Sequence, residues 1–351
     1  MPHSVPKPKS LNDNETIVLF PSLGHLEPDG RTWRIDVHGE VFSQRRISFG
    51  QRILLKLLQR AMKVPREALD TEIFKRRIDR FLATDGRGKK IAVRIGSDVH
   101  LLPKKSRGNG HFQATLRLSE GELQELQREG ISNAEWLRLE VYQTGNDEVS
   151  AQGQVHLLPS EGVSVISDID DTLKHTHVHS RQALLANTFL KEYEPVPGMA
   201  NLFRQWEREG AAFHYVSSSP WQLYRHLAAH FEEERFPAGS FHLRSFRLRD
   251  HLLRRILLMR RSGKAAIIKN ILQTFPGRRF LLVGDSGEAD PEIYAALARK
   301  FPQQVSRVLI REVDGPKNTL HRFMKAFRGI PGVIATTFRD PAEIHEAVTD
   351  L

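Results

Sequence analysis

The stretch that decides the fold of the C-terminal half reads VSVISDIDDT, residues 163–172. A short run rich in β-branched residues leads directly into the carboxylates Asp168, Asp170 and Asp171. Similar short apolar runs, separated by helical stretches, recur at residues 212–216, 280–283 and 305–310. This alternation predicts an α/β domain over residues 161–351, with a parallel sheet covered by helices on both faces.

Polar side chains follow three of these predicted strands. Asp168 comes after the first strand, Ser217 after the second and Asp285 after the third. In open parallel sheets the functional site lies at the carboxyl ends of the strands. We therefore expect these three residues to meet at one edge of the sheet.

Three carboxylates within four residues repel one another unless a cation or a proton lies among them. Hard oxygen ligands favour Mg²⁺, and the chain has no cysteine to bind zinc. A carboxylate such as Asp168 can attack a phosphate ester, and a second one at Asp170 can exchange protons with the leaving oxygen. By itself, an acidic loop that caps the next helix explains the same pattern.

Three later features add to this pattern. Val216-Ser217-Ser218-Ser219-Pro220 could hold phosphoryl oxygens with hydroxyls and amides, although serine there is also a common helix N-cap. Lys264 could supply a fixed positive charge, and it is one of many basic residues. The run GDSGEAD at residues 284–290 is typical of a metal-binding loop after a strand.

The order DIDDT, VSSS, Lys264 and GDSGEAD resembles the four motifs of the haloacid dehalogenase superfamily of phosphohydrolases. SDIDDTLK (167–174), YVSSSPWQLY (215–224) and GDSGEADPEIY (284–294) are similar to the catalytic domain of the actin-patch-protein type of phosphatidate phosphatase. The resemblance implies a Rossmann-like sheet of the haloacid dehalogenase type. It also implies Mg²⁺-dependent hydrolysis of phosphatidate to diacylglycerol and phosphate.

The resemblance further implies the metal-binding roles. Asp168 would be the nucleophile and a magnesium ligand. Asp170 would be the acid/base and would bind the metal through its backbone carbonyl. Asp285 would complete the metal site, and Asp290 would orient either the motif lysine or a metal-bound water.

The same resemblance assigns the phosphate-binding residues. Ser217 would bind the phosphoryl group, with Ser218 or Ser219 sharing that role. Lys264 would stabilise the charge of the transferring group, and Lys269 in the same predicted helix is a weaker alternative.

The pattern of residues 1–160 predicts a β-rich, sandwich-like domain with one helical insertion. Apolar and polar residues alternate in four segments, 32–41, 90–102, 111–118 and 136–143. Residues 49–64 instead follow a helical period, with an apolar stripe of Phe49, Ile53, Leu57, Ala61 and Val64, broadened by Leu54, Leu58 and Met62. This basic amphipathic helix could pack on the β domain or rest on an anionic membrane.

The whole chain of 351 residues carries a formal net charge of +10, which favours anionic partners. We expect a phosphorylated lipid substrate, with peripheral membrane contact as one option and without an obligate protein partner. A nucleic-acid end, a soluble phosphometabolite or non-catalytic binding to an anionic surface are the alternatives. No signal peptide or membrane-spanning run is recognisable, so a cytoplasmic protein is expected.

Three further features have both a functional and a structural interpretation. His175, His177 and His179 could bind a metal, but an exposed loop near the site is the simpler interpretation. Trp221 and Tyr224 fit core packing better than a substrate wall. The basic run 242–264 fits either a solvated face or an anion-attracting rim.

Overall fold

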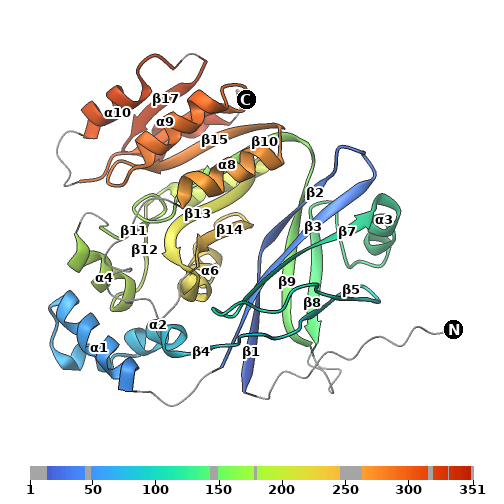
Figure 1. The fold of residues 1–351 in the computed structure, drawn as a ribbon. Coiled ribbons are helices and arrows are strands. Elements are labelled where there is room, and N and C mark those ends of the chain that lie inside the picture. The colour runs from blue at the N-terminus through green and yellow to red at the C-terminus, as the bar shows by residue number, and fades with distance from the viewer. Residues whose placement is uncertain are drawn as a thin grey trace. The chain divides into compact units, whose positions relative to one another are not determined.

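The computed structural model describes residues 14–43, 49–142, 149–177, 180–245, 263–314, 319–330 and 332–348. The chain divides into two compact units (Figure 1). The first, here called the β unit, consists mainly of Met1–Arg46 and Leu82–Ser160. The second, the α/β unit, consists of Ile47–Phe81, Glu161–Ala238 and His242–Leu351.

The β unit is built on one nine-stranded sheet with the order β1-β3-β2-β9-β8-β5-β6, in which β4 and β7 also pair with β3. One helix, α3 (Glu120–Arg128), follows β7 and begins with a capping box at Ser119 and Glu122. The strands are β1 (Glu15–Phe20), β2 (Ser22–Leu26), β3 (Thr32–Ser43), β4 (Thr84–Asp85), β5 (Ala92–Ile95), β6 (Asp98–Leu101), β7 (His111–Ser119), β8 (Trp136–Tyr142) and β9 (Val149–Leu158).

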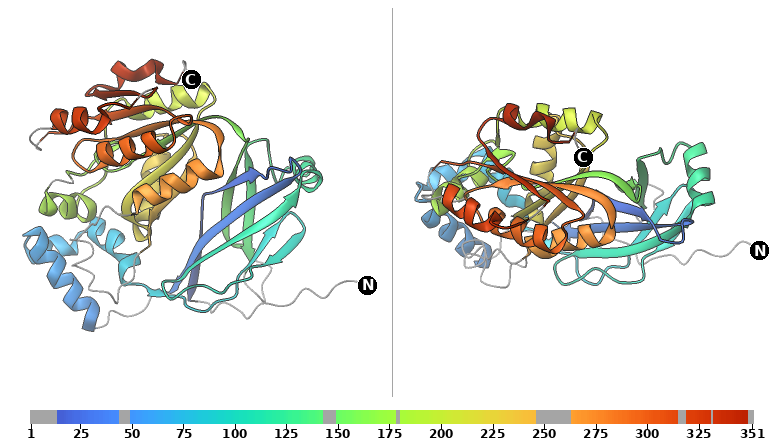
Figure 2. Two further views of the ribbon diagram at one scale, coloured as in Figure 1. Left: turned by 45° about the horizontal axis from the view of Figure 1, so that its top comes forward. Right: turned by 90° about the horizontal axis from the view of Figure 1, so that it is seen from above.

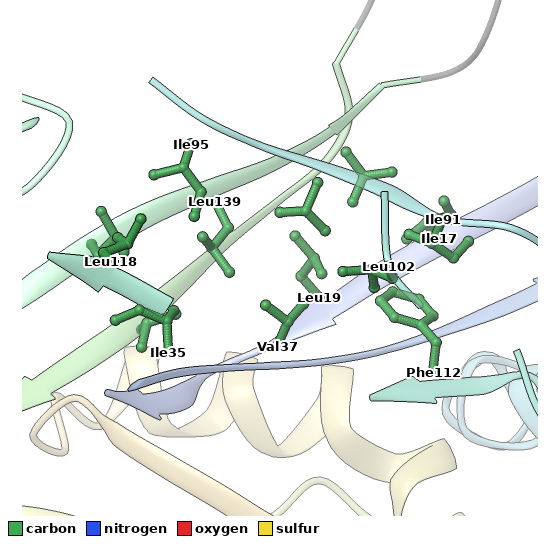
Figure 3. Packing of buried hydrophobic residues seen from close by; sticks show 14 of the residues in the cluster. Ile17, Leu19, Ile35, Val37, Ile91, Ile95, Leu102, Phe112, Leu118 and Leu139 are labelled. Carbon is green, nitrogen blue, oxygen red and sulfur yellow. The ribbon is translucent and has the colours of Figure 1, made fainter. Parts of the chain in front are cut away.

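The prediction of a β-rich N-terminal region is confirmed, and the described strands are hydrogen-bonded into one continuous sheet. The reason lies in β2, which pairs antiparallel with β3 and parallel with β9 and so joins the two halves. Alternating side chains from these strands form one buried apolar cluster, which includes Ile35, Val37, Phe112 and Leu139 (Figure 3).

The α/β unit contains a six-stranded sheet with the order β14-β13-β10-β15-β16-β17. The pairs from β13 through β17 are parallel, as predicted from the short apolar runs. The strands are β10 (Glu161–Ser167), β13 (Ala212–Pro220), β14 (Gly239–Arg244), β15 (Gly277–Asp285), β16 (Val305–Arg311) and β17 (Ile334–Phe338). A small separate pair is formed by β11 (Lys174–His175) and β12 (Glu194–Pro195).

Helices lie on both faces of this sheet (Figure 2). They are α4 (Arg181–Phe189), α5 (Met199–Arg208), α6 (Tyr224–Glu233), α8 (Lys264–Thr274), α9 (Asp290–Lys300) and α10 (Thr319–Phe327), with short 3₁₀ helices at Arg66–Asp70, Trp221–Leu223 and Pro341–Ala347. None of the helices in the described ranges is both long and apolar enough to cross a membrane.

The helical insertion differs from the prediction in two respects. Helices α1 (Phe49–Met62) and α2 (Glu72–Leu82) group with the α/β unit, where α1 packs against α4, and not with the β unit. The buried row of α1 is Leu54, Leu58 and Met62, whereas Ile53 and Leu57 are 44% and 38% exposed. The periodicity predicted Ile53 and Leu57 in the centre of the apolar stripe. The observed buried face is therefore rotated by about one residue from the predicted one.

Gly39 of β3 is a close contact in the β unit, and replacing it with alanine should destabilise the protein. The new Cβ would lie 2.5 Å from the Val18 carbonyl oxygen and would also collide with the Phe112 ring. We expect a loss of about 2 kcal/mol in the free energy of unfolding, measured by urea denaturation. Gly121→Ala in α3 is the matched control, because its Cβ meets nothing closer than 4.0 Å and alanine favours the helix. Equal stability of the two variants would contradict this packing.

Candidate active site

The ends of β10, β13 and β15 bring the three predicted site residues to one edge of the sheet. Asp168 is the first residue after β10, and its N–H donates to the Val283 carbonyl on β15 over 2.9 Å. Asp285 is the last residue of β15, and Ser217 lies near the end of β13. All three side chains are buried. Parallel pairing with the central strand β10 therefore positions the candidate site.

A buried cluster of three carboxylates forms the first half of the site. Asp168, Asp285 and Asp290 each offer an oxygen, and these oxygens lie within 4.8 Å of one another. Lys264 lies beside them, with its Nζ 2.8 Å from Asp168 Oδ1 and 2.5 Å from Asp290 Oδ1. The structure thus brings together four of the residues singled out from the sequence. It also places Lys264, and not Lys269, against the acidic groups.

The close approach of Asp290 depends on Gly284. A Cβ at Gly284 would collide with the Asp290 carboxylate and would lie 2.8 Å from the Tyr294 ring. Asp290 is the first residue of α9, and its Oδ2 accepts a hydrogen bond from the Asp285 N–H at 3.3 Å. Gly284, the first glycine of the run GDSGEAD, therefore allows Asp290 to fold back onto the strand end.

The electrostatics of this cluster favour an added cation. Burial raises the pKa of Asp168 and of Asp285 well above the usual range, and neighbouring carboxylates raise both further, although Lys264 acts in the opposite direction. Burial would lower the pKa of Lys264, but Asp168 and Asp290 outweigh it and hold the pKa above its usual value. One ammonium group thus faces three carboxyl groups.

Asp285 shows most directly that the cluster fits a metal ion. Its Oδ1 accepts hydrogen bonds from the N–H groups of Gly287 and Glu288, at 2.6 and 3.0 Å. Its Oδ2 is buried and accepts no hydrogen bond from the described residues. A buried oxygen in this position suits a ligand to a hard cation, and an all-oxygen donor set fits Mg²⁺.

A second group of polar side chains surrounds Asp170. Its Oδ1 accepts hydrogen bonds from Lys174 Nζ at 2.6 Å and Thr176 Oγ1 at 2.9 Å. Its Oδ2 accepts from Ser217 Oγ and Ser219 Oγ, both at 2.8 Å. Burial would raise the pKa of Asp170, but the Lys174 charge and these hydrogen bonds outweigh it and lower the pKa to about 2.

This second group also refines the predicted roles of the motif residues. The Asp170 carboxylate is fully engaged and lies outside the three-carboxylate cluster. Its contribution to a metal site through the backbone carbonyl therefore stays a prediction. Ser219, and not Ser218, joins Ser217 at Asp170, so the hydroxyls of the first and third serines converge there.

The remaining residues of DIDDT shape the loop between the two groups. Thr172 Oγ1 donates to Asp168 Oδ2 at 3.2 Å and so fixes the carboxylate that Lys264 holds from the other side. Asp171 adopts a left-handed conformation with φ +57°. Its Oδ1 accepts hydrogen bonds from the N–H groups of Thr176 and His177, at 2.6 and 2.8 Å. Asp171 therefore shapes the loop through these contacts.

Sequence reasoning missed the buried residues that support Asp170. Lys174 is buried 2.6 Å from Asp170 and lies 4.6 Å from the Tyr193 ring centre. Arg77 of α2 stacks on the same Tyr193 ring, and its guanidinium lies 3.5 Å from the ring centre. Lys174 lies four residues after Asp170, so its position in SDIDDTLK was a usable signal. The contribution of Arg77 has no local signal, because it comes from a distant helix.

Other candidates are peripheral to both groups. His175 and His177 stack with their ring centres 6.4 Å apart, and neither belongs to the carboxylate cluster. His179 and residues 246–262 of the predicted basic rim lie outside the described residues. Trp221 is buried, consistent with core packing.

The comparisons with known proteins identify the region that holds both groups. Residues 163–312 match the family model of the catalytic domain of phosphatidate phosphatase APP1. An uncharacterized protein of Schizosaccharomyces pombe is 32% identical over 176 residues, which are 48% of this chain and 29% of that protein. Phosphatidate phosphatase APP1 of Saccharomyces cerevisiae is 32% identical over 169 residues, which are 47% of this chain and 28% of that protein. The similarity therefore covers less than a third of either relative.

The three-carboxylate cluster predicts a pH-dependent stabilisation by Mg²⁺. A carboxyl group with a raised pKa stabilises the fold at low pH, and this contribution is lost as the pH rises from 3.8 toward the raised value. In chelator, stability should therefore fall over this range, and excess Mg²⁺ should restore it. The increase in melting temperature caused by Mg²⁺ should grow as the pH rises from about 5 to 7, because the ligands must be ionised.

Asp285→Asn should remove most of this Mg²⁺ effect and leave the chelated protein at least as stable as the wild type, since one buried charge is lost. Asp98→Asn, at an exposed carboxylate on β6, should respond to Mg²⁺ as the wild type does. Differential scanning fluorimetry with Mg²⁺ or chelator provides the measurement. A full Mg²⁺ shift in Asp285→Asn would exclude this residue as a ligand.

Asp170 predicts the opposite pH dependence. Its lowered pKa means that it contributes stability above the ordinary value of 3.8, and this is lost as the pH falls toward about 2. Asp170→Asn should therefore destabilise the protein at neutral pH by about 2 kcal/mol or more, because Lys174 would stay buried without its partner. The difference from the wild type in urea unfolding should shrink between about pH 5 and 2. A constant difference across that range would show that Asp170 is not ionised in the fold.

Proposed function

We propose that this chain is a Mg²⁺-dependent phosphomonoesterase of the haloacid dehalogenase type that hydrolyses phosphatidate to diacylglycerol and phosphate. The observation that carries the proposal is the pairing of two buried acidic groups at one sheet edge. Asp168 lies in a metal-compatible cluster with Lys264, and Asp170 lies beside it among serine hydroxyls. The match of residues 163–312 to a phosphatidate phosphatase catalytic domain supports the same chemistry.

Asp168 is oriented to act as the nucleophile. Thr172 holds one of its carboxylate oxygens and Lys264 the other, so the side chain cannot turn away from the strand end. Attack on phosphorus would form a bond between an Asp168 oxygen and the phosphoryl group while the bond to the glycerol oxygen breaks. The resulting aspartyl phosphate is then cleaved by water, which regenerates the carboxylate.

Asp168, Asp285 and Asp290, with the Asp170 backbone carbonyl, would hold the Mg²⁺ ion. When bound, this ion would neutralise charge between the attacking carboxylate and the phosphate. Lys264 stays close to Asp168 through its 2.5 Å contact with Asp290 and would bind a phosphoryl oxygen. This contact supports an orienting role of Asp290 toward Lys264, one of the two options that the resemblance implies.

Asp170 would protonate the leaving oxygen and then accept a proton from the attacking water. Burial would raise the pKa of Asp170, but Lys174, Ser217 and Ser219 lower it to about 2, which favours the ionised form at neutral pH. A bound phosphate would compete for the serine hydroxyls and would bring negative charge near Asp170. Both changes raise the pKa of Asp170 and favour the protonated form that the first step requires.

A non-catalytic module for anionic surfaces would not need this arrangement. Buried carboxylates repel an anion and destabilise the fold unless a cation compensates them, so a pure anion binder gains nothing from three of them. An oligonucleotide end or a soluble phosphometabolite would be hydrolysed by the same residues. The identity of the substrate is therefore best decided by comparing turnover.

Asp168→Asn should reduce phosphate release from phosphatidate by roughly a thousandfold or more, because the amide cannot form the acyl phosphate. Release by the wild type should require Mg²⁺ and stop in chelator. Asp314→Asn, which replaces an exposed carboxylate, is the matched control and should retain full activity. Full activity of Asp168→Asn would refute the mechanism. Faster turnover of an oligonucleotide end or a sugar phosphate in the same assay would refute the lipid substrate.

A further inference from the structure

Two helices of the α/β unit expose large apolar side chains. On α1, Ile53 and Leu57 are 44% and 38% exposed, and on α10, Leu320 and Met324 are 53% and 64% exposed. Each pair is separated by one helical turn and therefore forms a short apolar ridge. Such residues stay exposed in a folded domain at a cost in hydration, so a surface that covers them would be stabilising.

Both helices lie at the catalytic end of the sheet. α1 packs against α4, and α4 begins at Arg181, shortly after the loop that carries Thr176 and His177 to Asp171. Figures 1 and 2 show α1, α4 and α10 at the end of the sheet where the parallel strands finish. Helices α1 and α10, which carry these ridges, are thus at the same end of the α/β unit as the two acidic groups.

α10 is joined directly to the metal-binding loop. Arg322 donates to the carbonyl oxygens of Ser286 and Glu288, at 3.2 and 2.8 Å, and forms an ion pair with Glu292 at 2.9 Å. These carbonyls belong to the loop between Asp285 and Asp290. No residue of α10 itself is fully buried. Arg322 therefore ties α10 to this loop, while Leu320 and Met324 stay exposed.

The charged residues of the two helical segments themselves are all basic. The segment 49–64 contains no acidic residue and exposes Arg52, Lys56, Arg60 and Lys63. Residues 319–328 also contain no acidic residue, and they expose His321, Lys325 and Arg328. Apolar residues next to lysine and arginine on one helix surface are typical of helices that lie in the interface of an anionic bilayer.

We propose that α1 and α10 form a two-helix rim that docks on an anionic lipid surface and holds the catalytic edge of the sheet against it. Ile53, Leu57, Leu320 and Met324 would enter the boundary between headgroups and acyl chains, and the surrounding cations would bind lipid phosphates. The identity of the hydrolysed lipid in this inference rests on the proposed function. The rim adds the surface through which that lipid reaches Asp168.

Vesicle binding provides the test, with phosphatidylglycerol in phosphatidylcholine vesicles as the anionic lipid. Phosphatidylglycerol is a phosphodiester, so a phosphomonoesterase does not consume it during the measurement. The combined variant Ile53→Gln, Leu57→Gln, Leu320→Gln, Met324→Gln should bind roughly tenfold or more weakly in co-sedimentation, because apolar burial is lost while helix propensity is kept. Lys56→Gln with Arg60→Gln should weaken binding to a similar degree and only on anionic vesicles.

The matched control is Val99→Gln with Leu101→Gln on β6, where the side chains are 44% and 40% exposed, as on α1. This variant should bind vesicles as the wild type does. Monomeric short-chain phosphatidate provides the second measurement, because its hydrolysis needs no membrane. The rim variant should hydrolyse it at the wild-type rate and lose activity only on vesicles, while an unchanged melting temperature shows that it is folded.

The outcomes separate the two proposals. Wild-type protein that fails to bind anionic vesicles, or a rim variant that binds them undiminished, overturns the rim. Vesicle binding that needs the basic residues but not the apolar ridge also overturns it, because the contact would then be electrostatic alone. Absence of phosphate release from phosphatidate in every form, with rim-dependent vesicle binding intact, refutes the proposed function and leaves the rim standing.

Discussion

The structure of the candidate site depends on the burial of negative charge at the carboxyl ends of parallel strands. Asp168, Asp285 and Asp290 converge there with one lysine among them, and Asp170 lies nearby with a lysine of its own. Burying a carboxylate is unfavourable unless it is paired and hydrogen-bonded. Asp170 meets this condition fully, whereas the three-carboxylate cluster retains more negative than positive charge. The two groups are therefore suited to different chemistry, although Asp168 of one and Asp170 of the other are only two positions apart in the sequence.

The backbone makes this separation possible. Because Asp171 takes up the left-handed conformation, the chain turns sharply after Asp170, and the returning Lys174 and Thr176 can reach the Asp170 carboxylate. On the other side of the site, the missing side chain at Gly284 allows Asp290 to approach the strand end. Both devices are local. The turn at Asp171 brings Lys174 and Thr176 to Asp170, and Gly284 lets Asp290 join Asp168 and Asp285.

Much of this could be predicted from the sequence because the decisive features are local. Short apolar runs followed by Asp168, Ser217 and Asp285 were enough to predict three strands, their parallel direction and the sheet edge that these residues share. What could not be predicted depends on contacts between distant segments. The pairing of β2 with β9 joins the strands of the β unit into one continuous sheet, and Arg77 reaches Tyr193 from a helix that precedes it by more than a hundred residues. Lys174 falls between these cases, since its spacing from Asp170 was visible but its burial was not.

Helix α1 shows why periodicity alone could not choose the buried face. Its apolar residues cover more than one helical row, and either Ile53 with Leu57 or Leu54 with Leu58 and Met62 could have been the contact row. Packing on α4 selects the second row, because only one ridge of a surface helix can enter the groove of its neighbour. The first row is left exposed next to a line of basic residues. In the proposed rim, this arrangement has a use, because an anionic lipid surface would contact the apolar and the basic residues together.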